Sequence, residues 1–189
     1  MVGGDRTRAF AGVAIAALSI ILLAGCSDSS GGTSSSISLA QTKSPTQLLR
    51  NETASRVPTA IIDKVSASND TSVSCKTEKA DPKGLMRSWK SSVSISVEKG
   101  SAWRTKAVVD EMAASLVADG WEASKGFDSE VQVTLLTSKE SSVGIELGAV
   151  QPAEDSGKTA SISVTTTGPC VATAGKDSTE IRDLENADD

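Results

Sequence analysis

The chain has 189 residues, a length that predicts one folded domain. It carries 19 basic and 24 acidic residues, and a net charge of −5 at pH 7 makes it poorly suited to nucleic acid, which selects basic surfaces. It contains no histidine and no tyrosine, which excludes Ser-His-Asp triads, Cys-His dyads and zinc sites with histidine ligands.

The first 26 residues have the layout of a bacterial export signal. Arg6 and Arg8 form a short basic head, and an almost entirely apolar run follows from position 10 to position 23. That run has the length of a signal-peptide core and falls short of the roughly 20 residues that span a bilayer. It ends in Leu23-Ala24-Gly25-Cys26, which resembles the lipobox of bacterial lipoproteins.

This resemblance implies that the Cys26 sulfur receives a diacylglyceryl group and that the signal peptide, residues 1–25, is removed. Because two acyl chains anchor a protein stably where one is marginal, we expect attachment to the extracytoplasmic face of the cell membrane. An ordinary transmembrane anchor, or a secretory signal with an incidental cysteine, is the alternative. Cleavage removes two arginines and one aspartate, which leaves 17 basic and 23 acidic residues and a net charge of −6.

Composition also predicts the limits of the folded domain. Residues 27–36 are only Ser, Gly, Asp and Thr, so residues 26–44 are predicted to form a flexible tether. Residues 174–189 hold six acidic residues against two basic ones and are predicted to be an acidic, disordered tail. The segment between them, residues 45–173, is predicted to be a single α+β domain.

The first half of this domain predicts two short helices and then strands. Ser44 and Pro45 are suited to begin a helix, whereas Pro58 cannot continue one, so two helices are expected to meet near Val57. A short strand is expected at 72–78, and Asp81-Pro82-Lys83-Gly84 is typical of a turn. Apolar residues then alternate with polar ones, which predicts a half-buried strand: Trp89, Val93, Ile95 and Val97.

The second half predicts one long helix and then a strand meander. Apolar residues recur at helical spacing over 102–119, and Gly120 follows as a C-cap. Three alternating segments with short links follow, which is typical of an antiparallel sheet with one wet face. The predicted fold class is therefore α+β, a two-layer sandwich of about five antiparallel strands with the long helix packed across them.

Two cysteines, Cys75 and Cys170, remain after the lipobox cysteine. An even pair in an exported chain predicts a disulfide, and a reactive or metal-binding pair is the alternative. The paired cysteines, the Ser/Gly tether and the closing Thr167-Gly168-Pro169-Cys170 resemble the small cell-envelope lipoproteins of actinobacteria, including mycobacteria. That resemblance implies an envelope setting and supplies no catalytic residues.

Few residues in the sequence could carry chemistry. Gly157-Lys158-Thr159 ends like a phosphate-binding loop, but Pro152 stands where that loop needs glycine. Asp110 and Glu111 diverge by about 100° on a helix, so they do not face each other. The three tryptophans, Trp89, Trp103 and Trp121, are expected to anchor the core, and the alternative is that they form one wall of an apolar ligand site.

These features leave three hypotheses for function. The first is a non-catalytic binding or accessory module that acts on an envelope protein. The second is a carrier of a lipid or other apolar ligand between helix and sheet, and the third, less favoured, is an enzyme that uses carboxylates alone. No cofactor or metal is predicted. A cavity above about 300 Å³ under the helix would favour the carrier, and a filled core with a flat exposed patch would favour the binding module.

Overall fold

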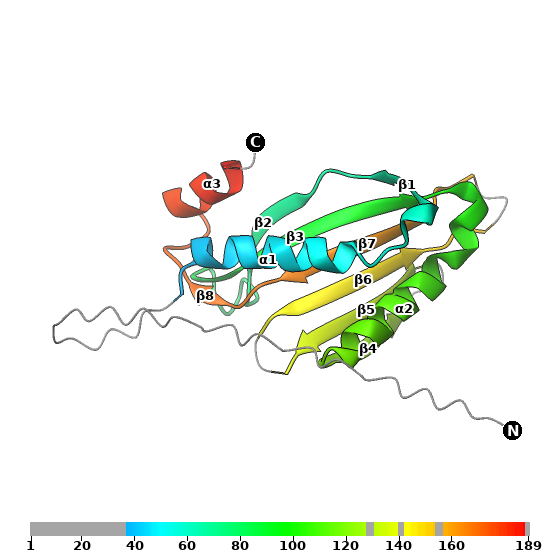
Figure 1. The fold of residues 1–189 in the computed structure, drawn as a ribbon. Helices are drawn as coiled ribbons and strands as arrows, with labels where there is room; N and C mark the ends of the chain where they lie inside the picture. The colour runs from blue at the N-terminus through cyan, green and yellow to red at the C-terminus, as the bar shows by residue number, and fades with distance from the viewer. Residues whose placement is uncertain (1–36, 128–130, 140–141, 154–156, 188–189) are drawn as a thin grey trace, which may run out of the picture. The chain divides into compact units, whose positions relative to one another are not determined.

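The computed structural model describes residues 37–127, 131–139, 142–153 and 157–187. The predicted signal peptide, Cys26 and most of the predicted tether lie outside these residues. The described chain forms an eight-stranded antiparallel sheet with α-helices on one face (Figure 1). No helix among the described residues is both long enough and apolar enough to cross a membrane.

The helices and short 3-10 helices are α1 (Leu39–Ala54), η1 (Thr59–Ile61), η2 (Lys99–Arg104), α2 (Thr105–Ala118) and α3 (Thr179–Asn186). The strands are β1 (Ile62–Val65), β2 (Asn69–Ser74), β3 (Met86–Val97), β4 (Trp121–Phe127), β5 (Val131–Ser138), β6 (Gly144–Val150), β7 (Ser161–Thr167) and β8 (Val171–Ala172). The predicted fold class was wrong in two respects, because the sheet has more than five strands and α2 is not a single long helix across it. A second helix, α1, covers the same face.

The sheet is organised around β3, which has 12 residues. β1 and β2 follow one another along one side of β3, pairing with its C-terminal and N-terminal parts in turn. β7 and β8 do the same along its other side. The meander from β4 to β7 then completes the sheet in the order β1-β3-β7-β6-β5-β4. Eight strands therefore occupy only six positions across the sheet, and sequence alternation cannot reveal that arrangement.

α1 begins earlier than predicted and is one continuous helix. Ser38 accepts a hydrogen bond from the Gln41 backbone N–H, and the Gln41 side chain accepts one from the Ser38 N–H. This reciprocal capping box starts the helix at Leu39, so residues 39–44, predicted to belong to the tether, are part of α1. Pro45 lies inside the helix on its exposed side, and Gln41, whose carbonyl loses its intrahelical donor, is also exposed. The two predicted short helices were therefore wrong.

The face of α1 that packs on the sheet is unusually polar. Thr42, Thr46 and Thr53 are buried there, and Thr166 of β7 donates a hydrogen bond from Oγ1 to the Thr46 carbonyl at 2.8 Å. Small hydroxyl side chains allow α1 to lie close to the link between β7 and β8. Gly168, in that link, makes the approach possible, because a Cβ at this position would lie 2.6 Å from Thr46 Oγ1.

Gly168→Ala is therefore expected to destabilise the protein by about 1–3 kcal/mol, the usual cost of overpacking a filled interior. Urea unfolding would measure the change. Gly100→Ala is a suitable control, because a Cβ at Gly100 would meet no atom within 4 Å. Equal effects of the two substitutions would show that close packing under α1 is not the cause.

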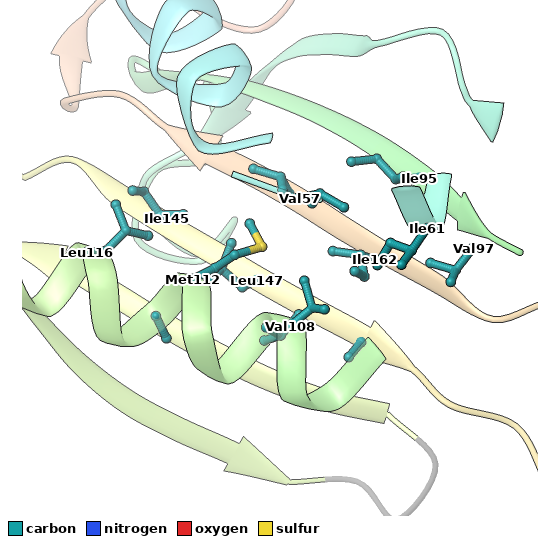
Figure 2. Packing of buried hydrophobic residues seen from close by; sticks show 14 of the residues in the cluster. Val57, Ile61, Ile95, Val97, Val108, Met112, Leu116, Ile145, Leu147 and Ile162 are labelled. Carbon is teal, nitrogen blue, oxygen red and sulfur yellow. The ribbon is translucent and has the colours of Figure 1, made fainter. Parts of the chain in front are cut away.

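α2 supplies the larger hydrophobic core. Val108, Val109, Met112 and Leu116 recur at helical spacing and are buried against Ile145 and Leu147 of β6 (Figure 2). Val57 and Ile61, which follow α1, join the same cluster from the other side. Residues 105–118 of the predicted helix form α2, whereas residues 102–104 belong to the 3-10 helix η2, so the single long helix expected over 102–119 is not present. Gly120, at φ +99°, follows the C-terminus of α2 as predicted.

The prediction of a disordered tail was wrong for the described residues. Ser178 caps α3, and Ile181 is buried with Leu39 and Trp89 in a second small core. The Glu185 carboxylate accepts hydrogen bonds from the Ser72 backbone N–H at 2.9 Å and the Ser72 hydroxyl at 2.8 Å. Buried Ile181 and the hydrogen-bonded Glu185 thus hold α3 against the domain, although the composition of this segment indicates a solvated tail.

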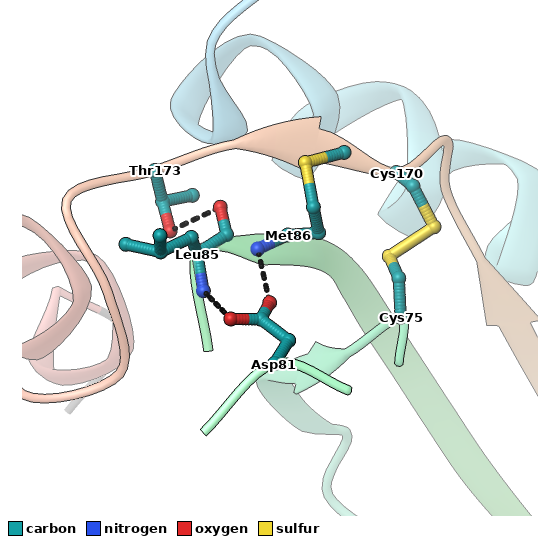
Figure 3. The surroundings of a disulfide bond; sticks show 6 residues. All are labelled: Cys75, Asp81, Leu85, Met86, Cys170 and Thr173. Atoms are coloured by element: carbon teal, nitrogen blue, oxygen red, sulfur yellow. Dashed lines mark hydrogen bonds between the residues drawn. A yellow bond between two sulfur atoms is a disulfide. The ribbon is translucent and has the colours of Figure 1, made fainter. Parts of the chain in front are cut away.

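The predicted disulfide is confirmed. Cys75 and Cys170 are bonded with their Cα atoms 6.1 Å apart, and the bond joins the end of β2 to the link between β7 and β8 (Figure 3). Beside it, the two carboxylate oxygens of Asp81 accept hydrogen bonds from the Leu85 and Met86 backbone N–H groups. These backbone hydrogen bonds hold the pKa of Asp81 below its ordinary value. The turn predicted at Asp81–Gly84 is therefore held in place by the Asp81 carboxylate, next to the start of β3.

Candidate functional site

The space between α2 and the sheet is filled. Val109 and Leu147 are fully buried, and side chains from the helix and from β6 meet directly (Figure 2). A carrier that holds an apolar ligand between this helix and the sheet is therefore not favoured by the packing.

The three tryptophans lie in three different surroundings. Trp89 is fully buried in the small core under α3, and Lys43 Nζ lies 4.9 Å from its ring centroid. Trp121 is partly buried against the larger core at the start of β4. Trp103, on η2, is 68% exposed. The structure does not bring them together as one wall of a ligand site, and two of them serve the core as expected.

A buried network of charges links α1 to the β2–β3 pair. Arg50 Nη1 lies 3.2 Å from a carboxylate oxygen of Asp70 and donates a hydrogen bond to Ser91 Oγ at 2.8 Å. The side chains of Arg50 and Asp70 are 9% and 7% exposed. Burial raises the pKa of Asp70, but hydrogen bonding with Ser91, the charge of Arg50 and the Trp89 indole outweigh it and hold the pKa below its ordinary value.

A second polar cluster ties α3 to the same strands. Arg87 donates hydrogen bonds to the Ser72 hydroxyl and carbonyl, and Ser72 in turn donates to Glu185. Burial raises the pKa of Glu185. Hydrogen bonds from Ser72 and Thr71 and the charge of Arg87 lower it by more, so the pKa lies below its ordinary value. Both depressed carboxylates are ionised structural acceptors at neutral pH. A general acid or base requires the opposite arrangement, with a pKa raised toward neutrality.

The other acids noted in the sequence do not converge either. Asp110 accepts a hydrogen bond from Gln132 Nε2 at 2.8 Å on the exposed surface, and Asp119 pairs with Arg56 at 2.9 Å. Within the described residues, no group of three His, Cys, Asp or Glu side chains is placed to hold a metal ion. Gly157-Lys158-Thr159 leads into β7, as a loop-to-strand junction should, and borders a cavity of about 480 Å³ lined by charges of both signs.

The second face of the sheet is not covered by any described helix (Figure 1). Cross-strand pairs define its members, because residues directly opposite in register share a face. We call this surface the open face, and its central residues are Lys90, Ser92, Ser94, Ser96, Val131, Val133, Leu135, Thr137, Gly144, Glu146, Gly148, Val150, Ser161, Ser163, Thr165 and Thr167.

Rows of short side chains cross the open face. One row runs Leu135, Glu146, Thr165, Ser92 across four strands, and the next runs Val133, Gly148, Ser163, Ser94. The β5 and β6 members of the two rows are aliphatic or glycine apart from Glu146, and the β7 and β3 members bear hydroxyl groups. Gly148 leaves room for the Ser163 side chain in the second row, because a Cβ at position 148 would collide with Ser163 Oγ.

This composition suits binding better than chemistry. Glu146 and Lys90 are the charged side chains among the central residues, and Leu135, at 43% exposed, is the most prominent aliphatic group. Short side chains lose little rotamer entropy when a partner covers them, so a flat face of Ser, Thr and Val can be buried at low cost. The alternating serines of 92–96 and 161–163 were the signal in the sequence, and they predicted a wet face without assigning it a role.

No family model, curated protein or solved structure matches this chain. The arrangement of its own residues is therefore the basis for assigning function.

Proposed function

We propose that this protein is a lipid-anchored cell-envelope lipoprotein that binds an envelope protein through the open face, without catalysing a reaction. The observation that carries the proposal is the uncovered sheet face, which combines exposed aliphatic groups with hydroxyl donors and acceptors. No described helix covers this face (Figure 1), and Glu146 and Lys90 are the charged side chains among its central residues.

The lipobox and the disulfide support the extracytoplasmic setting. Disulfides form and persist in oxidising compartments, and the Cys75–Cys170 bond would suit a chain exported past the membrane. The absence of histidine from the whole sequence and the ionised, well-bonded state of Asp70 and Glu185 support a non-catalytic role.

The anchor is tested by Cys26→Ser. Because the acyl chains supply the membrane affinity, the variant is expected to leave the membrane fraction or to accumulate as uncleaved precursor. Fractionation with mass spectrometry of the N-terminus would measure both outcomes. A cleaved, unmodified variant that still partitions fully with membranes would contradict the proposed anchor.

The open face is tested by a photo-cross-linking residue at Ser163 in the living cell. One partner protein is expected to be captured, and Leu135→Glu is expected to reduce its yield at least about tenfold, since a buried, unpaired charge costs more than 1.4 kcal/mol. Val117→Glu is the matched control, because Val117 is 45% exposed but lies on α2, on the covered side of the sheet.

Two results would contradict binding through the open face. One is equal loss of the adduct in the Leu135→Glu and Val117→Glu variants. The other is an adduct that forms as well from probes on α2 as from the probe at Ser163.

A further inference from the structure

The outer side of α1 carries an uncharged stripe. Helix geometry places Gln41, Pro45 and Leu48 along one side of α1, away from the buried Thr42 and Thr46, and Ile37, just before the helix, lines the same groove as Gln41 and Pro45. Ile37 and Leu48 are 57% and 66% exposed, which makes them two of the largest exposed aliphatic groups among the described residues. Leu48 lies in a helix whose mean composition is polar, and Ile37 lies just before it, so their exposure is not a by-product of a generally apolar segment.

An apolar groove adjoins this stripe. It has a volume of about 330 Å³, and Ile37, Pro45 and Leu49 of α1 and its lead-in line one wall. Val143, before β6, and Pro169, after β7, line the opposite wall. The stripe and the groove form one surface, which we call the α1 surface.

Charge around the α1 surface differs from the rest of the chain. No acidic residue lies between Asp28 and Glu52, although the chain as a whole has 24 acids. The two charges in that interval are both basic, Lys43 and Arg50. Lys43 faces the other side of the helix, where Nζ donates a hydrogen bond to the Leu184 carbonyl at 2.7 Å. The α1 surface therefore carries no charge from Ile37 to Leu48, and the nearest acid of α1, the exposed Glu52, lies on the same side one turn beyond Leu48.

We propose that the α1 surface rests on the lipid bilayer that holds the acyl chains of Cys26. This inference depends on the proposed lipid anchor. Ile37 follows Cys26 by 11 positions. The Ser/Gly-rich composition of the residues between them predicts a flexible coil, whose r.m.s. reach over 11 positions would be roughly 17–20 Å, so the groove would stay close to the headgroups. Tethering makes the contact intramolecular, and a small apolar area is then enough to keep it populated.

The outer side of α2 is a poorer candidate for the same contact. Asp110 and Glu111 are exposed there, and two acids would meet the anionic headgroups. Contact through α1 also sets an orientation. Because α1 lies on the covered face of the sheet, resting its outer side on the bilayer turns the open face away from the membrane, toward envelope partners.

The test uses the full lipidated protein in vesicles of phosphatidylcholine and phosphatidylglycerol. An environment-sensitive fluorophore is attached at Gln41→Cys on the α1 surface, or at Leu135→Cys on the open face as the control. With Cys26 acylated and Cys75 bonded to Cys170, the introduced thiol is the single free one. Vesicle flotation is measured first, and then emission wavelength and quenching by brominated acyl chains.

We expect the probe at position 41 to shift to shorter wavelength and to be quenched, because an apolar face of this kind enters the headgroup boundary by roughly 5–10 Å. The probe at position 135 should be neither shifted nor quenched. Leu48→Glu should abolish the shift at position 41 while the protein still floats with the vesicles.

Three results would overturn the inference. If the protein floats with the vesicles but neither probe is quenched, the proposed bilayer contact is contradicted and the lipid anchor is not. Protein that does not float would remove the anchor and the inference with it. A shift at position 41 that needs no vesicles and grows with protein concentration would assign the α1 surface to a second copy of the chain.

Discussion

Asp70→Ala is expected to lower the free energy of unfolding by about 3–5 kcal/mol, the usual cost of leaving one partner of a buried ion pair without the other. Arg50 would keep its hydrogen bond to Ser91, but its charge would have no counterion in a site where its side chain is 9% exposed. Trp89 would also lose its acceptor, since its Nε1 lies 3.4 Å from Asp70 Oδ1. Urea unfolding followed by circular dichroism would measure the loss.

A second ion pair provides the control for burial. Arg56 and Asp119 lie 2.9 Å apart, closer than Arg50 and Asp70, but their side chains are 24% and 54% exposed. Asp119→Ala is therefore expected to cost no more than about 1 kcal/mol, because solvent screens the exposed pair. Equal costs for the two substitutions would mean that the Arg50–Asp70 pair is not held away from water.

The same pair predicts how stability depends on pH. The folded protein holds the pKa values of Asp70 and Glu185 below their ordinary values of 3.8 and 4.5. The unfolded chain therefore binds protons more readily in this range, so the stabilisation is complete above the ordinary values and is lost as the pH falls through the lower, folded-state values. Asp70→Asn should flatten the acid limb of a stability-against-pH curve, and an unchanged slope would contradict this assignment.

These polar sites explain why the sequence predicted some elements and missed others. The long apolar repeat of α2 and the alternation of β3 were visible, since Val108, Met112 and Ile95 bury their side chains against one another in the way their spacing indicates. α1 buries threonines and an arginine, so hydrophobic periodicity gave no sign that it is one helix lying on a sheet. Its capping box, Ser38 with Gln41, was present in the sequence and would have located the true start.

The C-terminal segment was missed for a similar reason. A composition rich in acidic residues predicts a solvent-exposed segment. Glu185 instead accepts three hydrogen bonds from Thr71 and Ser72, which lie more than a hundred positions earlier. Contacts of that kind depend on which strand ends near which helix, and spacing within a segment carries no such information. The alternating serines predicted that one side of the sheet faces solvent. They did not predict how many strands the open face spans, because that depends on the register between strands far apart in the sequence.

The Cys75–Cys170 disulfide is expected to contribute up to about 4.7 kcal/mol, the chain-entropy value for a loop of roughly 100 residues. The two cysteines are 95 positions apart, so the reduced unfolded chain gains much freedom that the bonded one lacks. The Cys75→Ser, Cys170→Ser variant should unfold at a clearly lower urea concentration than the oxidised protein.

The position of the disulfide also predicts that its loss will weaken contacts in the folded protein, in addition to raising the entropy of the unfolded chain. It joins the end of β2 to the segment that leads through β8, which has only two residues, into α3. Without it, that segment is held mainly by β8 pairing with Met86 and Arg87 and by the α3 contacts to Ser72. Wild-type protein treated with reductant should match the double variant, which controls for the serine hydroxyls. Unfolding midpoints that coincide for the oxidised and reduced proteins would show that packing alone holds the two ends of the sheet together.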